Sequence, residues 1–227
     1  MNITPAIIPE SIEDLENKLL QVKGMTKLVQ IDICDGRLTS EASWPYVEEY
    51  GELAEILGQE RGLPLWDKFD FEIDLMVLNP RFDYERWIDA GVSRIIFHFF
   101  SSNLEKDIVV LKELIKATKE RGVEAGIALN INTPISVIEE FKDDVVCVQF
   151  MGIKRVGFQG QPFEESVLER IKESREKYSD IHISVDGGVN FDTAEKLIGA
   201  GVDRLVIGSA IFNQGDIREA FNYFHTL

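Results

Sequence analysis

Acidic and amide side chains interrupt three short apolar runs of the sequence. Gln30 and Asp32 alternate with valine and isoleucine, Glu72 and Asp74 alternate with apolar residues in a second run, and Asp186 ends a third. Successive side chains of a strand point to opposite faces, so the two members of each pair share one face. Carboxylates gathered in a buried place need shared protons, a cation or hydrogen-bond donors. The pattern therefore indicates a functional site built on these carboxylates.

Two acids on opposite sides of a cavity suit one reaction in particular. One carboxylate removes a proton from a carbon next to a carbonyl, and the other returns a proton from the far face. An aspartate at a strand end is also a common helix cap or turn former, and that interpretation stays open for Asp35. Asp32, Asp74 and Asp186 together favour a functional site.

Glycine clusters near the end of the chain form a second set. In a parallel barrel the loops after the last strands commonly hold phosphate with backbone N–H groups, and glycine permits the close approach. We therefore expect a small phosphorylated ligand to bind the residues of these loops, namely Gly157, Gly160, Gly187, Gly188, Gly208 and Ser209.

Short β-rich runs alternate with amphipathic helical stretches along the whole chain. The eight predicted strands span residues 3–8, 27–33, 71–77, 93–98, 123–129, 145–150, 181–185 and 204–207. No linker separates them, so we predict a single α/β domain over residues 1–227 with the (β/α)₈ TIM-barrel fold. A doubly wound open sheet is the competing fold, but no G-x-G-x-x-G follows the first strand. In a barrel, the site lies at the carboxyl ends of the strands.

The composition limits the partners. The 227 residues carry a formal net charge of −16, and the sequence pI is about 4.6. This acidity argues against nucleic acid, which needs a basic surface. No apolar run is long enough to span a membrane. Two cysteines, Cys34 and Cys147, are too few for a disulfide framework and fit a cytoplasmic location.

The chain resembles the ribulose-phosphate 3-epimerase family over nearly its whole length. The matching segments are residues 29–36, 72–80, 128–134, 157–163, 185–189 and 207–212. The resemblance implies a phosphate-binding barrel that interconverts ribulose 5-phosphate and xylulose 5-phosphate. It also implies that Asp32 and Asp186 work as acid and base on either face of C3, through an enediolate. Met76 and Met151 match positions that line the family's pocket, and Cys34 replaces a third methionine there.

The sequence departs from this family at the metal site. The family binds a divalent metal through two histidines and two aspartates, and its histidines align with Gln30 and Asp74. Loss of both imidazoles disfavours zinc and ferrous iron. Asp32, Asp74 and Asp186, together with Gln30, could still hold Mg²⁺ or Mn²⁺ through oxygen atoms. The alternative is that no metal binds.

Further departures concern the loops. An alanine, Ala6, replaces the family's serine near the first strand's end, and Lys154, Arg155 and Val156 replace Asn-Pro before Gly157. The two basic residues could reach a phosphate or form an exposed pair.

The remaining assignments concern the pocket wall and the reaction class. We expect Gln30, Glu72, Met76, His98 and Met151 to line the pocket, although His98 could instead be a hydrogen-bonded structural histidine. A sugar-phosphate-binding pseudoenzyme without a metal is the main alternative to an epimerase. A decarboxylase ranks third, because such enzymes usually need a lysine near the carboxylates. The apolar helix faces could support a homo-oligomer.

Overall fold

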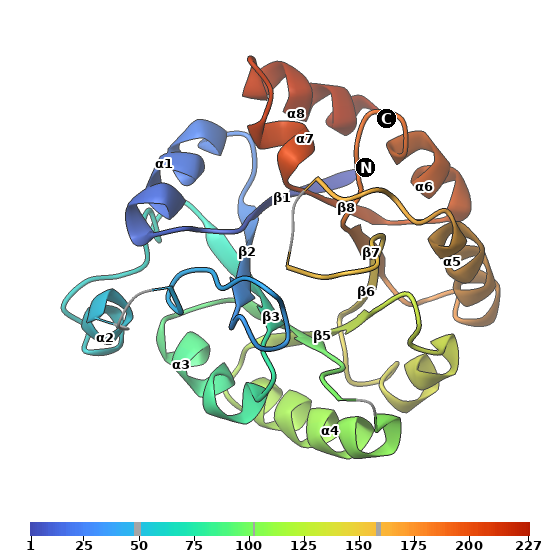
Figure 1. Ribbon diagram of the computed structural model, residues 1–227, viewed down its shortest axis with the longest axis horizontal. Coiled ribbons are helices and arrows are strands. Elements are labelled where there is room, and N and C mark those ends of the chain that lie inside the picture. The colour runs from blue at the N-terminus through green and yellow to red at the C-terminus, as the bar shows by residue number, and fades with distance from the viewer. Residues whose placement is uncertain (48–50, 102, 158–159) are drawn as a thin grey trace.

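The computed structural model describes residues 1–47, 51–101, 103–157 and 160–227. Eight parallel strands form a closed barrel in chain order, and the helices surround it (Figure 1). The strands are β1 (Asn2–Ile7), β2 (Leu28–Cys34), β3 (Asp70–Met76), β4 (Arg94–His98), β5 (Glu124–Leu129), β6 (Cys147–Met151), β7 (Ile183–Asp186) and β8 (Arg204–Ile207). The predicted TIM barrel is confirmed.

The helical segments follow the strands as the alternating pattern indicates. They are α1 (Ile12–Val22), α2 (Gly51–Leu57), η1 (Pro80–Phe82), α3 (Tyr84–Asp89), α4 (Leu104–Glu120), η2 (Ile135–Glu140), α5 (Ser166–Lys177), α6 (Ala194–Ala200), α7 (Ser209–Phe212) and α8 (Ile217–Thr226). None of the helices in the described residues is long and apolar enough to cross a membrane.

Local sequence explains where several helices begin. The Ser11 side chain accepts a hydrogen bond from the backbone N–H of Asp14 and caps α1. Asn103 caps α4 in the same way through the N–H of Lys106. The segment from Pro80 to Ala90 is a 3₁₀ turn followed by α3. The N–H of Asp83 bonds to the carbonyl of Pro80 three residues back, so the first turn is too tight to continue as an α-helix.

The apolar core lies between the barrel and its helices, where the β-branched faces of the strands pack. A second, small cluster of Ile96, Ala128, Cys147 and Met151 lies inside the barrel. Polar side chains occupy much of the remaining interior, as the alternation in the strands predicts. The register pairs Asp32 of β2 with Asp74 of β3 and Met151 of β6 with Asp186 of β7.

Candidate active site

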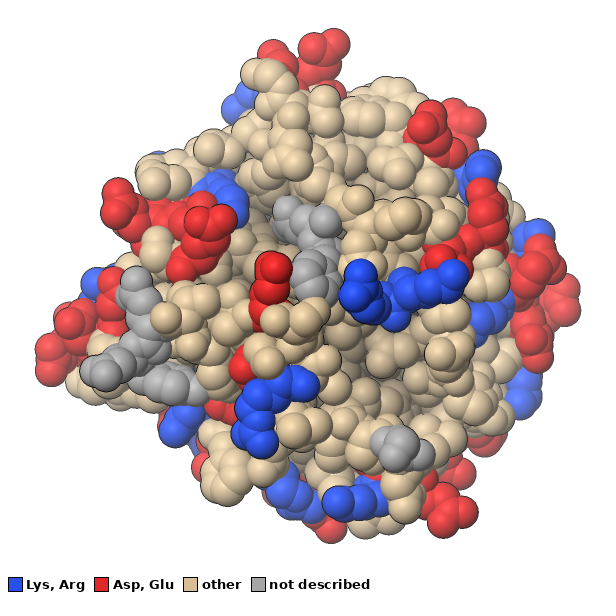
Figure 2. Space-filling view, in the orientation of Figure 1, with Lys and Arg blue, Asp and Glu red and all other residues tan. Residues whose placement is uncertain are grey.

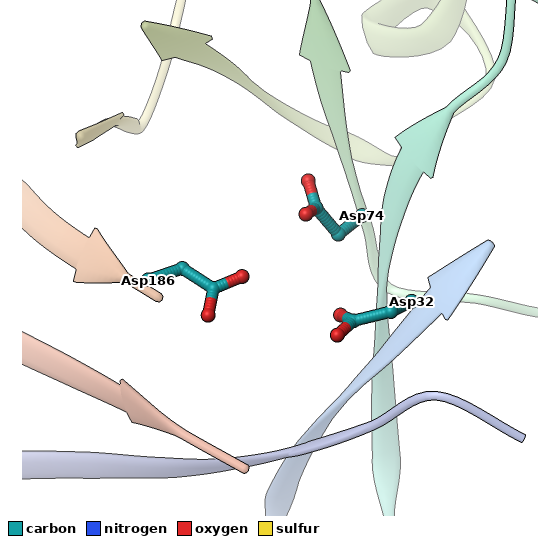
Figure 3. Close-up of side chains that lie close together, drawn as sticks. All are labelled: Asp32, Asp74 and Asp186. Carbon is teal, nitrogen blue, oxygen red and sulfur yellow. The ribbon is translucent and has the colours of Figure 1, made fainter. Parts of the chain in front are cut away.

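Three aspartates meet at the carboxyl end of the barrel. Asp32 comes from β2, Asp74 from β3 and Asp186 from β7, and Figure 3 shows their carboxylates directed toward one another. One oxygen from each lies within 4.8 Å of the others. Asp32 is 5% exposed, Asp74 0% and Asp186 8%. The structure thus brings together the three acids that the sequence analysis selected.

Burial makes Asp32 and Asp186 weak acids. Desolvation raises the pKa of Asp32 well above its usual range, and the negative charges of Asp186 and Asp74 raise it further. Desolvation, followed by the charge of Asp74, raises the pKa of Asp186 to about 7. A hydrogen bond from Gln30 lowers the pKa of both groups. A proton held on Asp186 is therefore exchangeable near neutral pH.

His98 lies behind Asp74. Its Nε2 is 2.7 Å from Asp74 Oδ1, and both side chains are fully buried. His98 is not among the residues that line the cavity above the aspartates. Of the two interpretations left open for His98, the structure shows the hydrogen-bonded one. Its partner is the acid that we expected in the site.

Glu72 occupies a different layer from the one expected. Its Oε2 accepts hydrogen bonds from Arg94 and Arg204, each at 2.8 Å, and the side chain is fully buried. It faces the barrel interior but lies two residues nearer the amino end of β3 than Asp74, and it does not line the cavity. The two arginines were not predicted as partners of Glu72, although each is a charged residue at the start of an apolar strand.

A hollow open to solvent lies between the aspartates and the late loops, and the empty space in it and at its mouth is about 470 Å³. Its wall includes the predicted residues Asp32, Asp186, Met76, Met151, Gly157, Gly160, Gly187, Gly188, Gly208 and Ser209. It also includes Ala6, Ile8, Ile153, Val189 and Val206, which the sequence analysis did not select as pocket residues. The wall does not include Gln30, Asp74 or His98, which lie deeper in the barrel.

The backbone conformation after β7 requires glycine at two neighbouring positions. Gly187 and Gly188 have φ values of +87° and +71°, a region that favours glycine. A Cβ atom on Gly188 would lie 3.0 Å from the Cα of Phe163, and one on Gly187 would lie 2.7 Å from the side chain of Ile153. Any side chain here would press on the loop that follows β6.

Several nearby residues have structural partners. Asp35 Oδ1 accepts hydrogen bonds from the N–H groups of Arg37 and Leu38, and its Oδ2 accepts one from Leu78, so it forms the turn after β2. Lys154 is 3.0 Å from Glu164 in an exposed ion pair and does not line the cavity. Cys34 is buried, and burial raises the pKa of its thiol, so it is not a nucleophile.

The charge of the surface is distributed unevenly around this end of the barrel. The loop after β2 crosses in front of the strands in Figure 1, so that view looks onto their carboxyl ends. In the same orientation, acidic side chains gather mostly along the outline, while basic groups lie to the right of the middle and below it (Figure 2). Most of the negative charge on this face is therefore displaced from its centre.

The donor set fits a divalent cation. Three carboxylates converge, and Asp74 Oδ2 and Gln30 Oε1 are buried with no hydrogen-bond partner among the described residues. Such oxygen atoms suit a hard ion, whose charge would offset the repulsion among the acids. The cluster could hold a metal, although it does not fix which one.

The fold and the site define a class of protein, a (β/α)₈ barrel with a carboxylate centre beneath glycine-rich loops. The chain matches the sequence model of the ribulose-phosphate 3 epimerase family over residues 2–212. It is 32% identical to the ribulose-phosphate 3-epimerase of Bacillus subtilis (strain 168), covering 98% of this chain and 97% of that protein. It is also 30% identical to the chloroplastic ribulose-5-phosphate-3-epimerase of Arabidopsis thaliana, and the match covers 96% of this chain and 74% of that protein. The chain belongs to the ribulose-phosphate 3-epimerase family.

Solved structures of other enzymes share the fold. The 3-hexulose-6-phosphate synthase of Salmonella typhimurium superposes with a TM-score of 0.71 at 13% identity, covering 100% of this chain and 97% of that one. The orotidine 5'-phosphate decarboxylase of Pyrococcus horikoshii OT3 superposes with a TM-score of 0.63 at 19% identity, and the match covers 98% of this chain and 97% of that one. At these identities the likeness shows the barrel alone.

Proposed function

We propose that this protein epimerises a ketose phosphate at C3, interconverting ribulose 5-phosphate and xylulose 5-phosphate. The observation that carries the proposal is the position of Asp32 and Asp186. They reach the same cavity from strands β2 and β7, and both have a raised pKa. Membership of the epimerase family supports the assignment.

The two carboxylates divide the proton transfers. The ionised member of the pair takes the proton from C3, and the electron pair of that C–H bond moves into an enediolate. The other member, which holds a proton, delivers it to the opposite face of C3 and regenerates a carbonyl. Each turnover leaves the proton on the other aspartate, so reaction in the reverse direction restores the starting state.

The late loops are suited to bind the substrate's phosphate. Gly187, Gly188, Gly208 and Ser209 line the cavity beside Asp186, and their backbone N–H groups can donate to a phosphate without adding a positive side chain. An acidic protein can hold an anionic sugar in this way.

A divalent metal would be held by Asp32, Asp74 and Asp186, with Mg²⁺ or Mn²⁺ favoured over Zn²⁺ or Fe²⁺ because the ligands are oxygen atoms. When bound, it would supply positive charge beside the enediolate oxygens.

The alternatives are weaker. A pseudoenzyme is not favoured, because the acids remain together in one buried cluster. A decarboxylase is not supported, because the residues that line the cavity include no lysine. The cytoplasmic location and a homo-oligomer stay predictions.

Exchange of solvent deuterium into the substrate tests the function. The protein is incubated with ribulose 5-phosphate in D₂O, with and without Mn²⁺, and C3 is followed by NMR. We expect deuterium at C3 together with xylulose 5-phosphate, and no xylulose 5-phosphate from the Asp186→Asn variant. Absence of deuterium at C3 under both conditions would overturn the proposal.

A further inference from the structure

One amide group joins the two acids of the proposed reaction. Gln30 Nε2 lies 2.7 Å from Asp32 Oδ1 and 2.9 Å from Asp186 Oδ2. Asp32 is on the same strand as Gln30, whereas Asp186 is 156 residues away in the sequence on the other side of the cavity. Gln30 is fully buried and does not line the cavity, so it reaches both carboxylates from beneath.

The two acids determine which way this amide points. Nε2 carries two N–H bonds, and each is directed to one carboxylate. The opposite orientation would place Oε1 against two carboxylate oxygens and leave both acids without this donor. The amide occupies one oxygen of each carboxylate, so the second oxygen of each is not engaged by Gln30.

We propose that Gln30 is a positioning residue that fixes the separation and orientation of Asp32 and Asp186. This inference rests on the proposed function, because it concerns the same acid/base pair. Hydrogen bonds to charged acceptors are directional and strong, and a carboxylate that turns away from the reacting carbon loses its effect on the rate. Gln30 itself does not touch the substrate.

Gln149 provides a matched control inside the same barrel. It lies on β6, is fully buried like Gln30, and neither its Nε2 nor its Oε1 has a hydrogen-bond partner among the described residues. Gln30→Met and Gln149→Met each remove one buried amide and keep a similar volume. They differ in whether the removed amide holds the acids.

Steady-state kinetics of the two variants test the role. We expect Gln30→Met to lower kcat about 100-fold, the loss that follows misplacement of a reacting group by about 1 Å, with KM within about twofold. We expect Gln149→Met to change kcat less than about threefold. Equal losses in the two variants, or a rise in KM that accounts for the loss in Gln30→Met, would refute the positioning role.

Side-chain NMR of the wild-type protein tests the contact of Gln30 with the two acids directly. This measurement depends neither on activity nor on the folding of a variant. Both Nε2 protons of Gln30 are expected to resonate downfield of those of Gln149, because only the former donate to carboxylates. Gln30 protons at the shifts of Gln149 would overturn the inference. A wild-type protein with no turnover but shifted Gln30 protons would reject the proposed function while supporting the contact of Gln30 with Asp32 and Asp186.

Discussion

Two groups of buried charges lie in the barrel interior, and they are balanced differently. Toward the amino ends of the strands, Glu72 is held by Arg94 and Arg204, so each charge has a partner of opposite sign. At the carboxyl ends, Asp32, Asp74 and Asp186 converge. Gln30 and His98 form hydrogen bonds with them, and no lysine or arginine among the described residues pairs with them. In this lower group of Glu72, Arg94 and Arg204, each charge faces a charge of opposite sign, which is typical of a structural role. In the upper group, formed by Asp32, Asp74 and Asp186, the negative charge must be balanced by a proton, a metal or a substrate, which is typical of a functional site.

The largest expected effect comes from removing one acid of the upper group. Asp186→Asn is expected to lower kcat by about 10³-fold or more, because the proton transfer on one face of C3 is lost. Stability is expected to stay equal or rise, since one repelling charge is removed. The epimerisation rate and urea unfolding check the two outcomes. A variant that keeps more than about a tenth of the activity would contradict the assignment.

The lower group is expected to show the reverse behaviour. Glu72→Gln leaves Arg204 buried without its counter-charge and is expected to cost about 3–5 kcal/mol of unfolding free energy. The activity of the molecules that remain folded is expected to be nearly normal. Glu124→Gln is the matched control, because Glu124 also pairs with Arg94 but is 51% exposed, and it is expected to cost less than about 1 kcal/mol. A similar loss of unfolding free energy in the two variants would show that the buried ion pairs of Glu72 have no special structural role.

The pH dependence of stability sharpens the comparison further. The pKa of Asp186 is about 7 when folded against an ordinary 3.8, so folding favours its protonated form. Its contribution to stability is therefore complete below about pH 4 and is lost as the pH rises toward 7, amounting to about 2–4 kcal/mol. Urea unfolding of wild type and Asp186→Asn between pH 4 and 8 measures the difference. A stability difference that does not change with pH would refute the raised pKa.

Stabilisation by a metal is an effect of similar size. Mn²⁺ at a hundred times its Kd is expected to add about 2.7 kcal/mol to the wild-type protein, because the ion binds the folded cluster. Asp74→Asn should abolish most of this gain, and Glu72→Gln should retain it. Thermal unfolding with and without Mn²⁺ decides the matter. An unchanged wild-type Tm at millimolar Mn²⁺ would show that the cluster does not take up this ion.

The alternation of residues in the strands was enough to predict the barrel and the acids inside it. It could not predict the depth of each side chain. Glu72 and Asp74 share a face but lie two residues apart, about 6.6 Å along the strand, and so in different layers. Which residues meet in a layer depends on the register of all eight strands, set by contacts between distant segments. That register places Glu72 with Arg94 and Arg204 and places His98 against Asp74.

Local sequence also left two helical details unpredicted. The 3₁₀ turn at Pro80 and the four-residue α7 after β8 are too short to show a helical period. Gly208 before α7 was recognised in the sequence, whereas the four-residue helix was not. Roles that depend on residue type were thus predictable, and those that depend on tertiary register were not.

The two cysteines have a consequence for the handling of the protein. Cys34 ends β2 and Cys147 begins β6, so in a barrel of parallel strands they lie at opposite ends. Both are buried, and burial raises the pKa of the Cys147 thiol to about 11. Thiols that stay protonated and out of reach of solvent react slowly with oxidants and alkylating agents. The folded protein is expected to keep its thiols unmodified in air, with neither an internal disulfide nor a cross-link between molecules.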